Sequence, residues 1–162
     1  MAFNLEEAAR LYTRELLARA WAMLGDWHEA EDAVQDAFAA ACEKPPKPGG
    51  ERAWLHRVTY NKCLDRLRRR RDVSLEALGD AAGGFTPEYD EGCAPAVIAA
   101  LSRLKGEDRA IVLWRVYDEL DYAEIARRLG IGEAAARKRY ERAKKQLASE
   151  LREYESEVNN GL

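Results

Sequence analysis

The sequence has few of the residues on which small catalytic and metal-binding sites usually depend. It contains two histidines and three cysteines among 162 residues, and no CxxC pair. Since Cys42, Cys63 and Cys93 are odd in number and far apart, neither a disulfide framework nor a zinc site is indicated. A nucleotide-binding glycine loop and a Ser/His or Cys/His constellation are also absent from the sequence. We therefore expect a protein that is not an enzyme and that holds no metal or other cofactor.

Long apolar runs are missing as well. No stretch approaches the roughly 20 apolar residues needed to cross a bilayer, and the start of the chain lacks the core of a signal peptide. The sequence therefore predicts a cytoplasmic protein. Its apolar fraction of 47% and charged fraction of 34% are ordinary for a folded chain, which excludes wholesale disorder.

The whole chain has no strong excess of one charge, since its formal net charge is −3. Individual segments, however, are strongly acidic or strongly basic. Residues 26–43 carry six acids and no lysine or arginine, and so do residues 72–93. Residues 51–71 and residues 127–145 each carry eight bases against two acids, a net charge of +6. Blocks of this kind indicate separate binding surfaces, of which the basic ones suit a polyanion.

The apolar periodicity is helical throughout and predicts an all-α fold without strands or internal repeats. Gly25 is expected to end the first helix and Asp26 to cap the second, whereas three prolines and two glycines make residues 44–50 a loop. The expected helices span residues 5–24, 26–42, 53–71, 96–104, 107–117, 122–129 and 133–154.

Residues 72–95 separate two groups of these helices. The segment is acidic, lacks sustained periodicity and contains GG, TP and AP steps, which favours a flexible linker with one short helical turn at residues 75–78. The sequence therefore predicts two small helical domains, residues 1–72 and 96–162, joined by a linker over residues 73–95.

Residues 121–143, DYAEIARRLGIGEAAARKRYERA, have the pattern of a helix-turn-helix. Asp121 and Glu124 are spaced as a capping box, and Gly130 stands where a tight turn favours a residue that tolerates positive φ. Ala126 is small where two helices must cross, and Ala136 continues the buried face of the second helix. That helix would present basic side chains to the major groove of DNA. A helical hairpin with a solvated basic face is the alternative, which the charge block disfavours.

Three motifs, in this order, resemble the extracytoplasmic-function class of bacterial RNA polymerase sigma factors, the minimal members of the sigma-70 superfamily. They read LGDWHEAEDAVQDAF, ERAWLHRVTYNKCLDRLRRRR and LDYAEIARRLGIGEAAARKRYERAKKQL, and they cover nearly the whole chain apart from its termini and residues 72–95. The resemblance implies a subunit that directs RNA polymerase core to specific promoters and initiates transcription. An autonomous helix-turn-helix regulator that binds DNA as a dimer is the alternative, but it leaves the acidic first domain without a role.

The resemblance also implies partners for the acidic helix, which contains a D-x-x-Q-[ED] pattern. It would dock on the clamp helices of the polymerase β' subunit, because acidic side chains repel phosphate and complement a basic protein surface. The β flap of the polymerase and an anti-sigma factor are further implied partners, and a merely solvated acidic face is the alternative. The residues expected to bind core polymerase are Glu29, Asp32, Gln35 and Asp36.

The loop at residues 44–52 and the helix after it match the part of the family that captures and melts the −10 element. A melted strand is stabilised by cationic and aromatic side chains, so Tyr60 is expected to stack on a base and the arginine run to grip phosphates. Trp54 is expected in the core. The full −10 set is Arg52, Arg57, Tyr60, Asn61, Lys62, Arg66, Arg68, Arg69, Arg70 and Arg71.

The second basic block matches the family's reader of the −35 element. Where many members have a serine and then G-T-V-K-S-R, this chain has Gly132 and then AAARKR at residues 134–139. With fewer hydroxyls, readout would depend on Arg137, Lys138 and DNA shape. The expected −35 residues are Glu133, Ala134, Arg137, Lys138, Arg139, Arg142 and Lys145. The acidic linker is expected either to thread a basic polymerase channel or to act as a solubilising tether.

Overall fold

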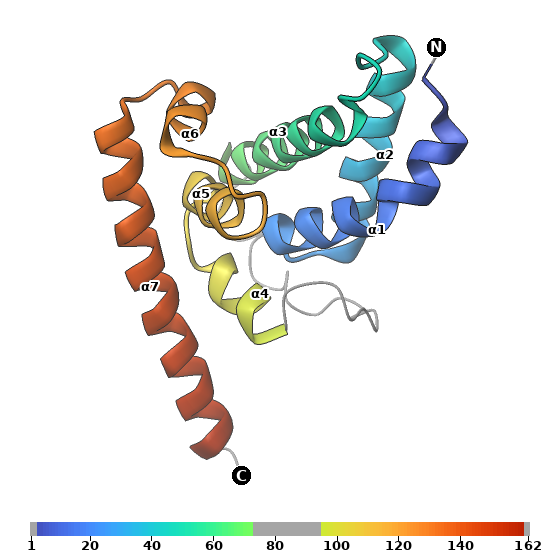
Figure 1. The fold of residues 1–162 in the computed structure, drawn as a ribbon. Helices are drawn as coiled ribbons and strands as arrows, with labels where there is room; N and C mark the ends of the chain where they lie inside the picture. The colour runs from blue at the N-terminus through green and yellow to red at the C-terminus, as the bar shows by residue number, and fades with distance from the viewer. Residues whose placement is uncertain (1–2, 73–94, 161–162) are drawn as a thin grey trace. The chain divides into compact units, whose positions relative to one another are not determined.

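The computed structural model describes residues 3–72 and 95–160, which form seven α-helices and no strand. The predicted all-α fold is therefore confirmed. The chain divides into two compact units, Met1–Ala94 and Pro95–Leu162 (Figure 1). Most of the predicted linker, with its helical turn at residues 75–78, lies outside the described residues.

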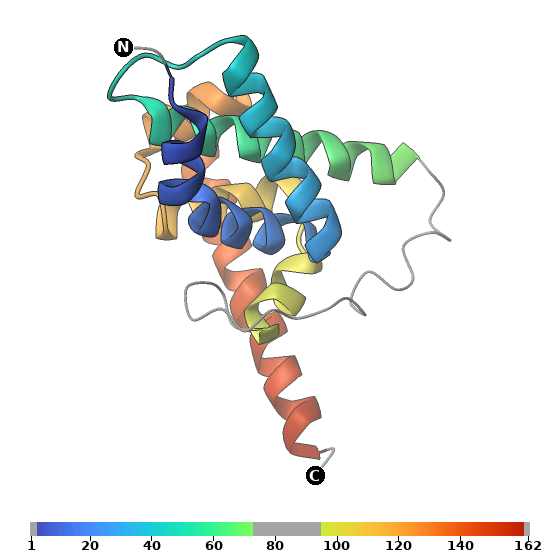
Figure 2. The ribbon, with the colours of Figure 1, turned by 90° about the vertical axis from the view of Figure 1, so that its right-hand side faces the viewer.

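Three helices form the first unit, and each packs against the other two (Figures 1 and 2). They are α1 (Leu5–Leu24), α2 (Trp27–Glu43) and α3 (Glu51–Asp72). Gly25 ends α1 with a φ of 70°, and the Asp26 side chain caps α2 by accepting a hydrogen bond from the N–H of Glu29 at 3.0 Å. Both residues act as the sequence predicted. Since they alone separate the two helices, α2 turns back beside α1.

A stripe of alanines brings α2 against the core. Ala30, Ala33, Ala37 and Ala41 are all 0% exposed and follow the i, i+3, i+7 spacing of one helix face. Such small side chains allow the α2 backbone to approach the buried leucines of its neighbours, among them Leu16 of α1. The acidic residues of α2 are consequently turned to the other side of the helix.

Four helices form the second unit, in which the first three pack along the long last one (Figures 1 and 2). They are α4 (Pro95–Ser102), α5 (Gly106–Val116), α6 (Tyr122–Leu129) and α7 (Glu133–Asn160). The buried side chains of Ile111, Leu113 and Trp114 make α5 the centre of the core. The last helix continues to Asn160, beyond the expected end at Tyr154.

The turn between α6 and α7 forms as the helix-turn-helix pattern predicts. The Asp121 side chain caps α6 by accepting a hydrogen bond from the N–H of Glu124 at 2.8 Å. Gly130 has a φ of 67°, and the N–H of Ile131 donates to the carbonyl of Ala126 at 3.0 Å, which closes the helix as a Schellman motif. The start of α7 is thereby fixed relative to α6.

Candidate functional surfaces

The exposed face of α2 carries the four residues expected to bind polymerase. Asp32 and Gln35 are exposed, and within the described part of the chain neither side chain has a hydrogen-bond or ion-pair partner. Glu29 and Asp36 are placed differently, because both are ion-paired with arginines of α3. The face therefore combines two uncommitted polar side chains with two that already have partners.

A groove between α1 and α2 adjoins this face and was not anticipated from the sequence. It encloses about 470 Å³, and its lining is largely apolar, with Leu17 from α1 and Val34 and Phe38 from α2. Gln35 lines the groove as well, so the groove and the polar face are continuous. Leu5 at the start of α1 also lines the groove and is 43% exposed. The signal in the sequence was the row of Leu5, Ala9 and Leu17 on α1, which lies beside the fully buried face of that helix.

Two ion pairs join the acidic helix to the basic one. Nη2 of Arg66 lies 3.1 Å from Oδ2 of Asp36, with the arginine side chain 21% exposed and the aspartate 50%. Arg70 is ion-paired with Glu29 and also donates from Nη1 to the carbonyl of Leu24 at 3.1 Å, at the end of α1. These two arginines of the −10 set thus hold the three helices of the unit together.

Other polar residues of the −10 set on α3 are more available. Arg57, Asn61 and Arg69 are exposed and Lys62 is half-buried, and none of the four has a polar side-chain partner among the described residues. Arg68 is exposed but lies 3.3 Å from Asp65. The side chain of Arg71 lies outside the described part of the structure.

The prediction for Tyr60 is wrong. Its side chain is 1% exposed, packed in the core of the first unit, so its ring cannot stack on a base in this conformation. Tyr60 lies four residues before Leu64, which is also buried, and this spacing puts both on the inner face of α3. Trp54, expected in the core, is half-buried.

A polar cluster that sequence reasoning missed joins α1 to α3. Nε2 of His56, which is 6% exposed, lies 2.8 Å from Oε1 of Glu15, and Nε of Arg52 donates to the same oxygen at 2.7 Å. Burial by itself raises the pKa of Glu15, but the hydrogen bonds from His56 and Arg52 outweigh it and hold this pKa below its ordinary value. The cluster fixes Arg52 beside α1 at the start of α3.

The outer face of α7 carries most of the residues expected to read the −35 element. Those that the structure leaves exposed are Glu133, Ala134, Arg137, Lys138, Arg142 and Lys145. Glu141 shares this face, since it lies four residues after Arg137 and four before Lys145. It is half exposed and lies 3.4 Å from Lys144. This acid was not part of the predicted set.

The guanidinium of Arg139, another residue of the predicted −35 set, is directed at α5. Nη2 of Arg139 lies 3.1 Å from Oε2 of Glu107 and 3.3 Å from Oδ1 of the buried Asp108. Arg139 stands between the buried Ala136 and Ala143 in sequence, a spacing that turns it to the inner side of the helix. It joins α7 to α5 and does not belong to the exposed basic face.

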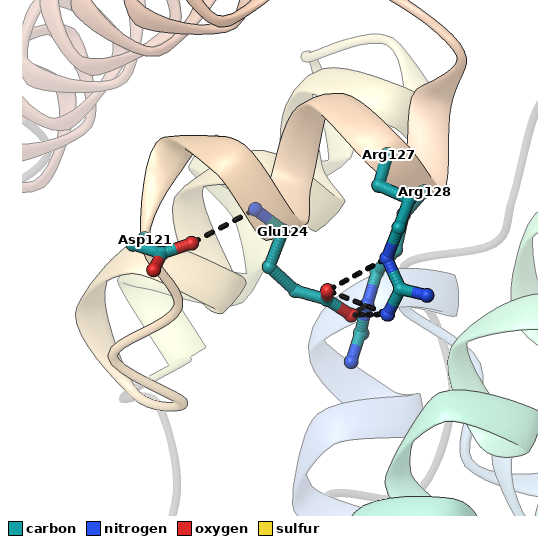
Figure 3. Close-up of polar contacts among 4 residues, drawn as sticks. All are labelled: Asp121, Glu124, Arg127 and Arg128. Carbon is teal, nitrogen blue, oxygen red and sulfur yellow. Dashed lines mark hydrogen bonds and ion pairs between the residues drawn. The ribbon is translucent and has the colours of Figure 1, made fainter.

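Arg127 and Arg128, two further bases of the segment 127–145, are ion-paired within α6. The Glu124 carboxylate accepts hydrogen bonds from Arg127 at 2.6 Å and from Nε of Arg128 at 3.0 Å (Figure 3). It does not turn back to the N–H of Asp121, so only half of the predicted capping box forms. Desolvation by itself raises the pKa of Glu124, but the hydrogen bonds from the two arginines outweigh it and hold this pKa below its ordinary value.

Three further features concern metal ions, thiols and membranes. In residues 3–72 and 95–160, no three His, Cys, Asp or Glu side chains are grouped so as to hold a metal ion. Burial raises the pKa of the Cys63 thiol to about 12, which leaves it un-ionised at neutral pH. None of the helices described is long and apolar enough to cross a membrane.

Comparison with known proteins gives matches over both units. Residues 8–73 match the family described as sigma-70 region 2, and residues 95–147 match sigma-70, region 4. The chain is 32% identical over 163 residues to the ECF RNA polymerase sigma factor SigE of Mycolicibacterium smegmatis, covering 94% of this chain and 63% of SigE. It is 34% identical over 134 residues to the ECF RNA polymerase sigma factor SigM of Mycobacterium tuberculosis, covering 81% of this chain and 68% of SigM.

The fold is similar to that of a solved structure. The sigma factor RpoE of Bartonella quintana, crystallised with the anti-sigma factor NepR, superposes with a TM-score of 0.71 over 91% of this chain and 96% of that one. At 22% identity this likeness concerns the fold alone.

Proposed function

Since the chain belongs to the extracytoplasmic-function (ECF) RNA polymerase sigma factors, we propose that it directs RNA polymerase core to specific promoters and initiates transcription there. The observation that carries the proposal is the separation of charge onto different faces. An acidic face beside an apolar groove lies on α2, and a basic face lies on α7. One surface suits a protein and the other suits DNA.

The polymerase would bind the first unit at Asp32, Gln35 and the groove that adjoins them. Apolar side chains in a groove supply burial, and the uncommitted carboxylate supplies charge complementarity with a basic helix. Glu29 and Asp36 would contribute less directly, since each is already paired with an arginine of α3. From the family, the proposed partner is the clamp helices of the β' subunit. An anti-sigma factor is a further proposed partner, since the Bartonella quintana RpoE was crystallised with one.

Contacts to the −10 element would come from α3. Arg57, Asn61, Lys62 and Arg69 have no polar side-chain partner among the described residues and could bind a melted strand without first breaking a contact. Arg66 would have to exchange its ion pair with Asp36 for a phosphate. Since Tyr60 is buried, no aromatic of the predicted set remains to stack on a base.

Contacts to the −35 element would come from the first turns of α7. Arg137 and Lys138 would meet base edges, while Arg142 and Lys145 would meet phosphates and make binding dependent on salt. Residues 1–72 and 96–162 would act as the two DNA-binding domains. Because they belong to one chain, binding of either would raise the effective concentration of the other at the promoter. The protein would catalyse no chemistry itself and would act in the cytoplasm.

Transcription in vitro tests the proposal. Purified chain and purified bacterial core polymerase are incubated with a promoter library, and the transcripts are sequenced. We expect discrete start sites that depend on the chain and that share sequence upstream. A chain that does not co-elute with core polymerase, but protects palindromic duplexes as a dimer, would support the autonomous regulator instead.

A further inference from the structure

Cations and tyrosines alternate across three helices of the second unit. The guanidinium carbon of Arg115, at the end of α5, lies 4.3 Å from the ring centroid of Tyr122 on α6 and 5.6 Å from that of Tyr140 on α7. The two rings are 6.2 Å apart. The guanidinium of Arg137 lies 5.0 Å from the Tyr122 ring, and Nζ of Lys144 lies 5.5 Å from the Tyr140 ring. All four cation distances are within the range of cation–π attraction.

The inner part of this array is anchored. Nη1 of Arg115 donates to the carbonyl of Leu120 at 2.9 Å, in the turn that leads to α6. Tyr122 and Tyr140 are both half-buried, and their rings contact the same Arg115 guanidinium. Tyr122 is therefore held by Arg115 and Tyr140, and its ring offers a fixed surface to Arg137.

Arg137 is restrained by an aromatic ring, whereas three other arginines near it are restrained by carboxylates. Arg127, Arg128 and Arg139 are each held by carboxylates, which use their N–H donors and cancel their charge. Arg137 is exposed and has no ion pair among the described residues, so its restraint comes from the Tyr122 ring. A ring face attracts a guanidinium through its charge, but it neither neutralises that charge nor occupies the five N–H donors. Arg137 is thus positioned and still able to bind.

We propose that Tyr122 is a positioning residue that fixes the Arg137 side chain in the free protein for contact with promoter DNA. The proposal rests on the function proposed above, in which Arg137 meets the −35 element. Arginine loses considerable side-chain freedom when it binds, and a partner that restrains it beforehand reduces that loss. Removing an exposed cation–π contact should weaken DNA binding about two- to fivefold.

The test compares Tyr122→Leu, which removes the ring, with Tyr122→Phe, which removes only the hydroxyl. Full-length variants are titrated with a fluorescent duplex of random sequence at low salt. Tyr122→Leu should weaken binding about two- to fivefold, and Tyr122→Phe should bind like the wild type. In Tyr122→Leu/Arg137→Ala, the loss should equal that of Arg137→Ala alone, because the two residues act through one contact. Additive losses, or a Phe variant as weak as the Leu variant, would overturn the proposal.

A second readout does not depend on DNA. The ring current of Tyr122 should shift the NMR signal of the Arg137 Nε–H group in the free chain, and this shift should survive in Tyr122→Phe and vanish in Tyr122→Leu. An unchanged signal in all three proteins overturns the positioning role. If instead Arg137→Ala itself leaves DNA binding unchanged, the proposed −35 surface fails, which is a separate outcome from failure of the positioning role. Circular dichroism and thermal unfolding of each variant identify any loss of folding.

Discussion

Charge reversal at Asp32 tests the polymerase-binding surface most directly. Asp32 is exposed and has no partner among the described residues, so Asp32→Lys breaks no contact within the fold. Two unit charges about 4 Å apart interact by about 1 kcal/mol in water and about 4 kcal/mol at an effective dielectric constant of about 20. Reversal replaces an attraction by a repulsion, so the loss is at least about 2 kcal/mol. That corresponds to about 30-fold weaker binding to core polymerase.

The same change at Asp36 would be harder to interpret. A lysine there would lose the ion pair with Arg66 and repel its guanidinium, which would disturb the packing of α2 on α3 as well as the surface. The matched control is Glu43→Lys, which makes the same change of charge on the same helix about 16 Å further along its axis. Its lysine is also compatible with the dipole at the end of the helix.

The assay is fluorescence anisotropy of labelled chain titrated with core polymerase at two salt concentrations. Asp32→Lys should bind about 30-fold more weakly at low salt, with a smaller loss at high salt because the charges are screened. Glu43→Lys should bind like the wild type, and both variants should unfold at the same temperature as the wild type. Equal losses for the two variants, or no loss for Asp32→Lys, would refute the assignment of this face.

Four further outcomes are expected. Arg139→Ala should lower the stability of the second unit by about 1–3 kcal/mol in thermal unfolding, because the buried Asp108 loses a charged partner. Glu141→Gln should raise affinity for random duplex DNA about two- to fivefold, since it removes a negative charge from the basic face. Glu15→Gln should lower the free energy of unfolding at neutral pH. Since the pKa of Glu15 is lowered in the folded state, its charge stabilises the fold only above that pKa. The difference in stability between variant and wild type should therefore disappear as the pH falls through it. Alkylation of the native protein at neutral pH should label the exposed Cys42 and spare Cys63, whose pKa of about 12 and burial protect it, as peptide mass spectrometry would show.

Controls are available in the same helices. Arg142→Ala removes an exposed arginine of α7 and should leave thermal stability within about 0.5 kcal/mol of wild type, in contrast to Arg139→Ala. A stability loss for Glu15→Gln that is the same at every pH would contradict the role given to its charge. Labelling of Cys63 before unfolding would show that α3 opens more readily than its burial indicates. Unchanged DNA affinity in Glu141→Gln would place this residue away from the phosphates.

What the sequence by itself determined is local. Helix spacing, the end of α1 at Gly25, the cap at Asp26 and the positive φ of Gly130 depend on residues a few positions apart. These features form as predicted. The charge blocks are also a property of the linear chain. Even the burial of Tyr60 and the inward position of Arg139 had a local signal, since both residues share helix faces with buried neighbours.

Only the tertiary structure decided which charges remain available. Arg66 meets Asp36 across 30 residues, and Arg139 meets Glu107 across 32, so no spacing within a helix could reveal these pairs. The groove beside Gln35 and the tyrosine beside Arg137 likewise arise where separate helices pack. The physical reason is that an ion pair or a cation–π contact acts over a few ångströms, and packing alone determines which side chains come that close.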